Sequence, residues 1–237
     1  MGSFQYFPLA LPFLLFFLLL VGFLVVLVEI GILRYAYERI GIHPRHIFGL
    51  LLLSIFGSSL NIPIATFPAE RIHSGEIVRF YGMRYVVPYA HTLPRTVLAV
   101  NVGGAVLPLL LSFHLMSRNR IFGRGLLGII AVSAIVHSLA RPVPGVGIAV
   151  PTFLPALSSA AVAVILSRRM AAPLAYISGS MGTLVGADLL NLGRIREMGA
   201  PVASIGGAGT FDGIFLTGIV AVLLAGMFGG RPSRVED

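Results

Sequence analysis

Long apolar stretches separated by short polar segments make up almost the whole chain. We predict about seven transmembrane helices from them, because a bilayer core of roughly 30 Å requires about 20 apolar residues per helix. The expected ranges are 8–33, 46–66, 95–116, 123–140, 148–167, 171–192 and 210–229. The first stretch is too long for a secretory signal and has no basic segment before it, so we expect a retained helix. The pattern therefore predicts an all-α polytopic membrane protein.

One longer segment, 67–94, separates the second and third predicted helices. Its residues 76–89 combine β-branched and aromatic side chains around Gly82, which is typical of a β-hairpin. Such a hairpin would lie over the outer face, either as an ordinary structured loop or as a functional lid. The whole chain, 1–237, is then a single transmembrane bundle domain with a short cytoplasmic tail at 230–237.

Polar residues recur near the outer ends of four predicted helices. Asn61 and Asn101 lie on the second and third helices, and Asp188 and Asp212 lie on the sixth and seventh. An offset of four helices preserves the direction of the chain across the membrane. The pattern therefore suggests a 3+1+3 parallel duplication, with 123–140 as the linker helix.

Composition supports the membrane and excludes several functions. The chain is 57% hydrophobic and 11% charged, whereas soluble domains have about a quarter of their residues charged. The absence of cysteine and lysine excludes thiolate metal sites and Schiff-base chemistry. His43 and His46 fit a solvated loop better than a metal site, and no nucleotide-binding or metalloprotease motif occurs. We therefore predict no metal, no cofactor and, since the arginines flank the apolar stretches, no nucleic-acid partner.

The distribution of arginines predicts the orientation. Ten arginines lie in 34–45, 118–124, 168–169 and the tail, and seven lie in the alternate set of segments, four of them in the long loop. Arginines in long loops count for less in the positive-inside rule. The N-terminus is therefore expected outside and the C-terminus in the cytoplasm.

Two aspartates are the principal candidates for function, because an ionisable residue within a span costs about 2.5–3.5 kcal/mol on insertion scales. Asp188 lies near a helix C-terminus, where the helix dipole disfavours a carboxylate. Asp212 precedes an apolar run, so it is either functional or a helix N-cap. Glu29 lies five residues from Arg34 and can reach the interface.

Three further residues complete the candidate site. Asn61 and Asn101 lie at the depth of the aspartates, either as ligands or as interhelical hydrogen-bond partners. Arg141 is the nearby cation, either as a partner of an aspartate or as an interfacial anchor. Glycines and prolines interrupt the apolar pattern in the same layer, and transporters use such breaks to present backbone groups to a substrate.

Four segments carry a resemblance to a known family: 101–105, 140–148, 186–190 and 206–215. Over about residues 45–228, the chain resembles a family of multi-pass membrane proteins of bacteria and archaea that is catalogued only as a domain of unknown function. The resemblance implies the prokaryotic inner membrane and no particular activity. The aspartate pair, with the Pro155-Ala-Leu157 sequence, is more weakly similar to presenilin-like aspartyl proteases, but the motif around Asp212 departs from theirs and Pro155 precedes both aspartates.

Three functions are compatible with these residues. The first is a small transporter, or a protein binding a solute or ion, with Asn61, Asn101, Asp188, Asp212 and Arg141 around the substrate. The second is an intramembrane aspartyl protease of membrane peptides, in which Asp188 and Asp212 are catalytic and share a proton. The third is a non-catalytic membrane subunit. In each case the lipid bilayer surrounds the chain.

The predicted orientation can be tested with reporter fusions after Val235. We expect activity only from a reporter that works in the cytoplasm, because the more basic set of loops includes the tail. Activity of a periplasmic reporter at the same position would reverse the orientation.

Overall fold

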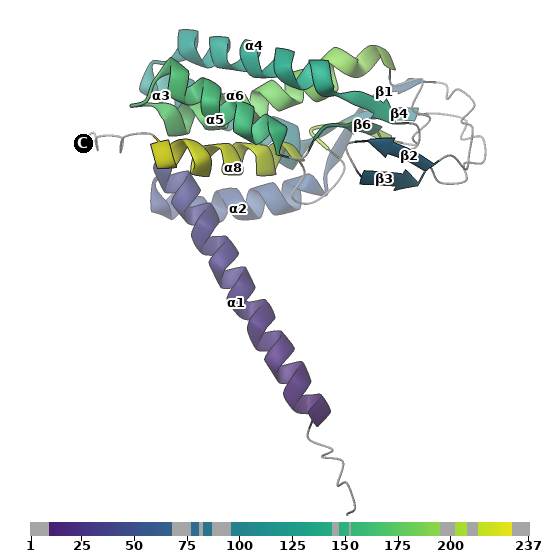
Figure 1. Ribbon diagram of the computed structural model, residues 1–237, viewed down its shortest axis with the longest axis vertical. Helices are drawn as coiled ribbons and strands as arrows, with labels where there is room; N and C mark the ends of the chain where they lie inside the picture. The colour runs from purple at the N-terminus through teal and green to yellow at the C-terminus, as the bar shows by residue number, and fades with distance from the viewer. Residues whose placement is uncertain are drawn as a thin grey trace, which may run out of the picture.

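The structure, a computed structural model, describes residues 10–67, 77–80, 83–86, 96–143, 147–151, 153–194, 202–207 and 213–228. This part of the chain is mostly helical (Figure 1). Its α-helices are α1 (Ala10–Arg39), α2 (Pro44–Ser58), α3 (Leu107–Asn119), α4 (Phe122–Leu139), α5 (Leu154–Leu166), α6 (Ala171–Thr183) and α8 (Gly213–Phe228). A π-helical turn, η1 (Val102–Val106), precedes α3, while η2 (Leu184–Asp188, π-helical) and η3 (Leu189–Arg194, 3-10) continue α6.

Small sheets gather at one end of the bundle, beyond the first residues of α8 (Figure 1). The largest has the order β1-β4-β7, formed by β1 (Asn61–Phe67), β4 (Thr96–Asn101) and β7 (Val202–Ile205). β1 pairs antiparallel with β4, and β7 pairs parallel with it. Two antiparallel pairs complete the set: β2 (Ile77–Phe80) with β3 (Met83–Val86), and β5 (Arg141–Val143) with β6 (Gly147–Ala149).

Several predicted elements are confirmed. The helix expected at 123–140 is α4, the one at 171–192 is α6 with η2 and η3, and the one at 210–229 contains α8. The hairpin expected within 76–89 is the pair β2–β3, in which Phe80 lies opposite Met83.

Three predicted helices are wrong in part, and so is the expectation of an all-α protein. The helix expected at 46–66 ends at Ser58 and is followed by β1, the one at 95–116 begins as β4 and η1, and the one at 148–167 begins as β6. Apolar runs of four to eight residues fit a strand as well as a helix by periodicity alone. Here Pro63 lacks the N–H that would continue α2, and Pro155 near the start of α5 fits the first turn of a helix.

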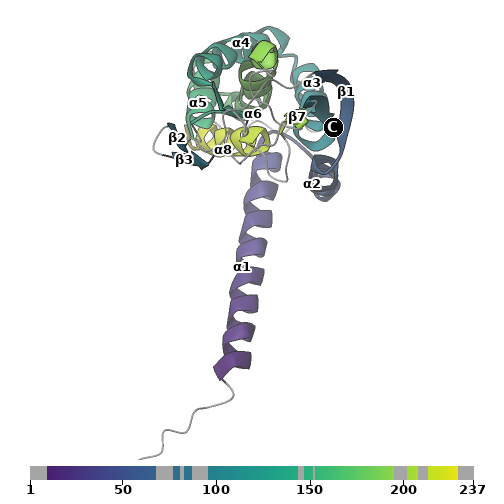
Figure 2. The ribbon, with the colours of Figure 1, turned by 90° about the vertical axis from the view of Figure 1, so that its right-hand side faces the viewer.

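Helix α6 is the core of the bundle. All its residues from Ala171 to Thr183 are buried, and α3, α4, α5 and α8 surround it, as the end-on view in Figure 2 shows. The fully buried Tyr176 of α6 lies in the same cluster as Tyr37 of α1. Its residues are small or apolar and none is charged, which suits such a central position.

Small residues let α4 and α6 approach closely. A Cβ on Gly182 would lie 2.7 Å from the Val132 side chain, and one on Gly186 would lie 2.6 Å from the Ser133 carbonyl oxygen. The Ser133 hydroxyl donates a hydrogen bond of 3.2 Å to the Gly182 carbonyl. This spacing of glycines by four residues with a hydroxyl across the contact is typical of helix packing in membranes.

Helix α1 extends away from the bundle (Figure 1), and among its described side chains those of Ala36 and Tyr37, near its end, are the buried ones. Its segment Leu18–Arg39 and the helix Phe122–Leu139 are the two described helices long and apolar enough to cross a membrane. Three further helices are apolar but shorter: α2, α5 and the segment Leu216–Phe228 of α8. A bundle of seven full-length spans is therefore not what the described residues show.

The close contact of α4 with η2, which continues α6, can be tested by Gly186→Ala. We expect the free energy of unfolding to fall by about 2 kcal/mol, because the added methyl group meets a backbone oxygen that a rotamer change cannot move away. Gly123→Ala on α4 is the control, since nothing lies within 4 Å of its Cβ position. Equal unfolding temperatures for the two purified variants would contradict the prediction.

Candidate functional site

Asn101 is the best-satisfied polar side chain where the strands meet the helices. It is 1% exposed and lies at the last position of β4, opposite Asn61. Its Nδ2 donates to the Ser58 carbonyl oxygen at 2.7 Å and to the Asn61 Oδ1 at 3.1 Å, and its Oδ1 accepts from the Gly104 amide at 2.8 Å. Both of its N–H groups and its oxygen are therefore engaged, and the side chain joins α2, β1 and η1.

Asn61 extends this set of hydrogen bonds to a distant segment of the chain. It is exposed, at the first position of β1. Its Oδ1 also accepts a hydrogen bond of 2.6 Å from the hydroxyl of Ser204 in β7. Asn61 and Ser204 are 143 residues apart in the sequence, so this bond ties the β7 segment to the α2–β1 connection.

The same short segment binds Asp188. The Gly206 amide, directly after β7, donates a hydrogen bond of 2.8 Å to the Asp188 Oδ2. Gly206 has φ +91°, which favours glycine, and a Cβ there would lie 2.6 Å from the Ala105 nitrogen. A Cβ on Gly104 would in turn overlap the Gly206 carbonyl oxygen. Both positions therefore require glycine.

These contacts define a polar junction, formed by Ser58, Asn61, Asn101, Asp188, Ser204 and Gly206. Three of the residues expected at the site from sequence, Asn61, Asn101 and Asp188, belong to it, linked through β7. Asp188 and Ser204 are partly exposed. The β7 segment is thus bonded to Asn61 through Ser204 and to Asp188 through Gly206.

The other candidates from the sequence have different positions. Arg141 is exposed in β5, where it pairs with Ala149 of β6. Asp212 lies outside the described residues. Glu29 is exposed on α1, and His43 caps α2 by accepting from the Arg45 amide. Among the described residues, no group of three His, Asp or Glu side chains could hold a metal ion.

Sequence reasoning missed a second polar pair, Asn191 with His137. The buried Asn191 Nδ2 lies 3.1 and 2.9 Å from the carbonyl oxygens of Gly186 and Ala187, and 3.3 Å from the His137 Nδ1. The Asn191 amide thus links the last turn of α4, at His137, to the backbone of η2. The signal was a single asparagine three residues after Asp188, and our sequence analysis did not single it out.

The charge distribution around the polar junction favours a donor or a cation as ligand. Asp188 is the carboxylate of the polar junction and accepts from the Gly206 amide. The Ser204 oxygen is a potential acceptor, while Asn61 Oδ1 already accepts from Asn101 and Ser204. Carboxylate, carbonyl and hydroxyl oxygens are the ligands preferred by hard cations. The same groups bind ammonium or hydroxyl groups of small polar solutes.

The fold and the site define a mostly helical protein with a buried central helix and a polar junction at its strand-bearing end. The family model described as a protein of unknown function (DUF1614) matches residues 55–224. The chain belongs to this family, as its sequence motifs predict. The match extends from the end of α2 into α8 and so contains every residue of the polar junction. Neither a curated protein nor a solved structure matches the chain.

The role of Asn101 can be tested by removing its contacts separately. Asn101→Ala should lower the free energy of unfolding by about 2–4 kcal/mol, because it leaves the buried Ser58 carbonyl and Gly104 amide without this partner. Asn101→Asp should cost at least as much, since the cap on Gly104 is kept but a carboxylate replaces the donor facing two oxygens.

Asn119→Ala is the matched control for these variants. The Asn119 amide makes a local bond to the Leu115 carbonyl within α3, so its loss should cost under about 1 kcal/mol. Chemical denaturation of the purified proteins measures all three changes. An Asn101→Ala variant as stable as Asn119→Ala would contradict the structural role assigned to Asn101.

Proposed function

We propose that the chain is a multi-pass protein of the prokaryotic inner membrane, with its N-terminus outside and its C-terminus in the cytoplasm. The proposal is supported by large apolar side chains on the outward faces of the bundle helices. Phe56 on α2 is 68% exposed, Phe113 on α3 is 64% exposed and Ile165 on α5 is 82% exposed. Exposed apolar area of this extent is costly in water and favourable in lipid.

In this proposal, short helices span the bilayer together with the strands that adjoin them. Helices α3, α5 and α6, of 13 residues each, are about 20 Å long, which is less than the hydrocarbon core. The strands β1, β4 and β7 continue the path beyond α2, α3 and α8. Backbone of this kind is tolerated at membrane depth where protein or a water-filled cavity surrounds it.

Within this protein we propose that the polar junction binds a small polar solute or an ion for transport. The observation that carries the proposal is the hydrogen-bonded connection from Asn101 through Asn61 to Ser204, with Asp188 bound to Gly206 in the same β7 segment. The accessible Asn61, Ser204 and Asp188 would contact the ligand. The fully engaged Asn101 would position them, and Asp212 and Arg141 remain further candidates.

A parallel duplication stays part of this proposal. It is supported by the parallel pairing of β4 with β7, in which Val100 lies opposite Ile205. Each of these strands is followed by a helix of the bundle, α3 or α8. The arrangement gives the two halves the same direction, as a 3+1+3 duplication requires.

The experiment that tests this function is Asp188→Asn. Purified protein is first screened by thermal shift against inorganic cations and small polar solutes, since a ligand of the folded state stabilises it by RT ln(1 + [L]/Kd). The stabilisation should disappear in Asp188→Asn, because the amide keeps the shape of the carboxylate and removes its charge. Glu29→Gln, on the exposed face of α1, is the control and should respond as the native protein does.

The alternatives give different results in the same set of variants. A peptidase would lose cleavage in Asp188→Asn and Asp212→Asn but keep it in Ser204→Ala, whereas solute binding should be weakened in Ser204→Ala. A non-catalytic subunit would show neither ligand-induced stabilisation nor uptake in any variant, the native protein included. Full ligand binding and uptake in Asp188→Asn would therefore overturn the transporter proposal.

A further inference from the structure

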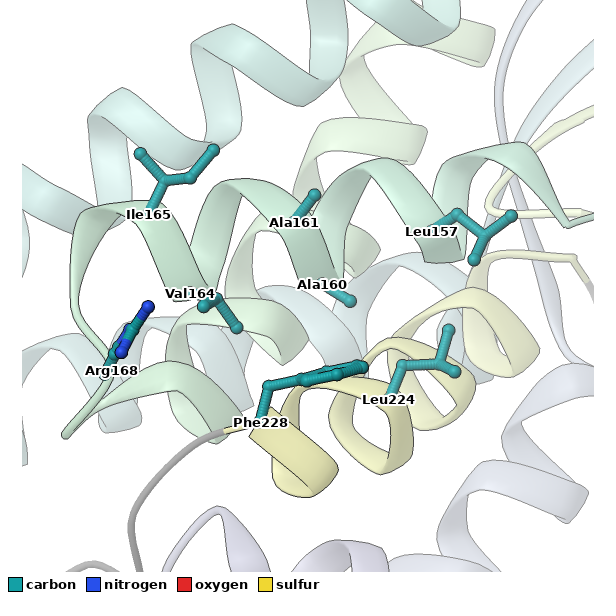
Figure 3. Close-up of a pocket in the computed structure, with 8 residues that line it drawn as sticks. All are labelled: Leu157, Ala160, Ala161, Val164, Ile165, Arg168, Leu224 and Phe228. Atoms are coloured by element: carbon teal, nitrogen blue, oxygen red, sulfur yellow. The ribbon is translucent and has the colours of Figure 1, made fainter.

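A groove of about 530 Å³ lies between α5 and α8, away from the polar junction. Figure 3 shows Leu157, Val164, Leu224 and Phe228 along it, with Arg168 beside the last turn of α5. The alanines Ala160 and Ala161 also line it, and their small side chains leave room between the two helices. The groove is thus an apolar channel with one cation at its end.

Arg168 belongs to a strongly basic end of the molecule. The connection 167–170 joins α5 to α6 at the end of the bundle opposite the sheets. The arginines there or in the adjoining turns are Arg39, Arg45, Arg118, Arg120, Arg124, Arg168 and Arg169. The one described carboxylate near this end, Glu38, is bound to Arg34 at 2.8 Å.

Arg168 has the properties of a headgroup-binding residue. It is exposed, and no ion pair or hydrogen bond joins it to another residue in the described part of the chain. A guanidinium group binds phosphate oxygens in a bidentate manner. The groove therefore fits an amphipathic ligand whose negatively charged head contacts Arg168 and whose long apolar part contacts the side chains of α5 and α8.

We propose that this groove is a binding site for an anionic phospholipid, with an acyl chain between α5 and α8 and the phosphate on Arg168. The inference rests on the proposed membrane location, and it is independent of the solute site. Basic pockets between helices on the cytoplasmic side are a known mode of recognition for anionic lipids. The charge complementarity at Arg168 selects a lipid over a second protein helix, which would bring no phosphate to that end.

The test uses the full-length protein purified in detergent, with equal amounts of phosphatidylglycerol and phosphatidylcholine, and counts bound lipids by native mass spectrometry. Native protein should retain phosphatidylglycerol about fivefold more than phosphatidylcholine, the ratio expected for one arginine at an anionic headgroup. Arg168→Gln should remove this preference and keep total lipid binding. Ala161→Phe should reduce the retention of both lipids, because the ring fills the groove.

Each variant has a matched control at an exposed position on α4. Arg124→Gln removes a charge at the same end and Ala134→Phe adds a ring to an exposed alanine, and neither residue lines the groove. Both controls should keep the lipid preference of the native protein.

Two results would overturn the lipid site. One is a phosphatidylglycerol preference that persists in Arg168→Gln. The other is a dimer of the native protein that Ala161→Phe dissociates, since a second copy would then cover the groove. The solute assay on the same Arg168→Gln protein distinguishes this failure from that of the proposed function. Ligand-induced stabilisation should be unchanged there, whereas a protein that stays soluble without detergent would remove the membrane premise of both proposals.

Discussion

The rest of the structure depends on hydrogen bonds to the buried backbone groups at the ends of short helices. Asn101 makes these bonds where α2, β4 and η1 meet. A helix that ends inside the molecule leaves carbonyl groups without partners, and one that begins there leaves N–H groups. The Asn101 side chain donates to the Ser58 carbonyl at the end of α2 and accepts from the Gly104 amide at the start of η1. One amide therefore connects the end of one helix to the beginning of another.

Close backbone contact is the second condition for this arrangement. Gly104 and Gly206 meet so tightly that a side chain at either position would overlap the other segment. The contact brings β7 beside β4, and the parallel register then places Ser204 and Gly206 within reach of Asn61 and Asp188. Hydrogen-bonded strands at this end also satisfy backbone groups that an apolar surrounding could not.

Most of the fold could be predicted from hydrophobic patterning, and the errors have one physical origin. Segments such as 171–192 are long enough that only a helix fits their apolar run, and α6 with its continuation is found there. Segments 59–66 and 96–101 are short apolar extensions of a helical pattern, and their conversion to β1 and β4 depends on pairing with each other. Pairing partners distant in sequence are not visible in local periodicity.

Three residues of the candidate site could be predicted from local sequence because they interrupt the hydrophobic pattern. A polar side chain in an apolar run is conspicuous, so Asn61, Asn101 and Asp188 could be selected without knowledge of the fold. Their partners could not, because Ser204 and Gly206 are common in loops and acquire their role only from the β4–β7 register. The difference between Asn101, whose hydrogen-bonding groups are all used, and the exposed Asn61 also follows only from the three-dimensional arrangement.

The contacts of the polar junction limit which of its parts could move when a ligand binds. Asp188 lies at the end of η2, which continues the wholly buried α6, so its backbone cannot shift without disturbing the core. Ser204 and Gly206 flank Ile205 at the end of β7, and two side-chain hydrogen bonds hold this segment in addition to its pairing with β4. Breaking those two bonds would cost about 1–3 kcal/mol each if the groups stayed dry, and much less if a ligand or water replaced them. A polar ligand could therefore replace the Ser204–Asn61 contact at low cost, whereas an apolar one would leave both groups unsatisfied.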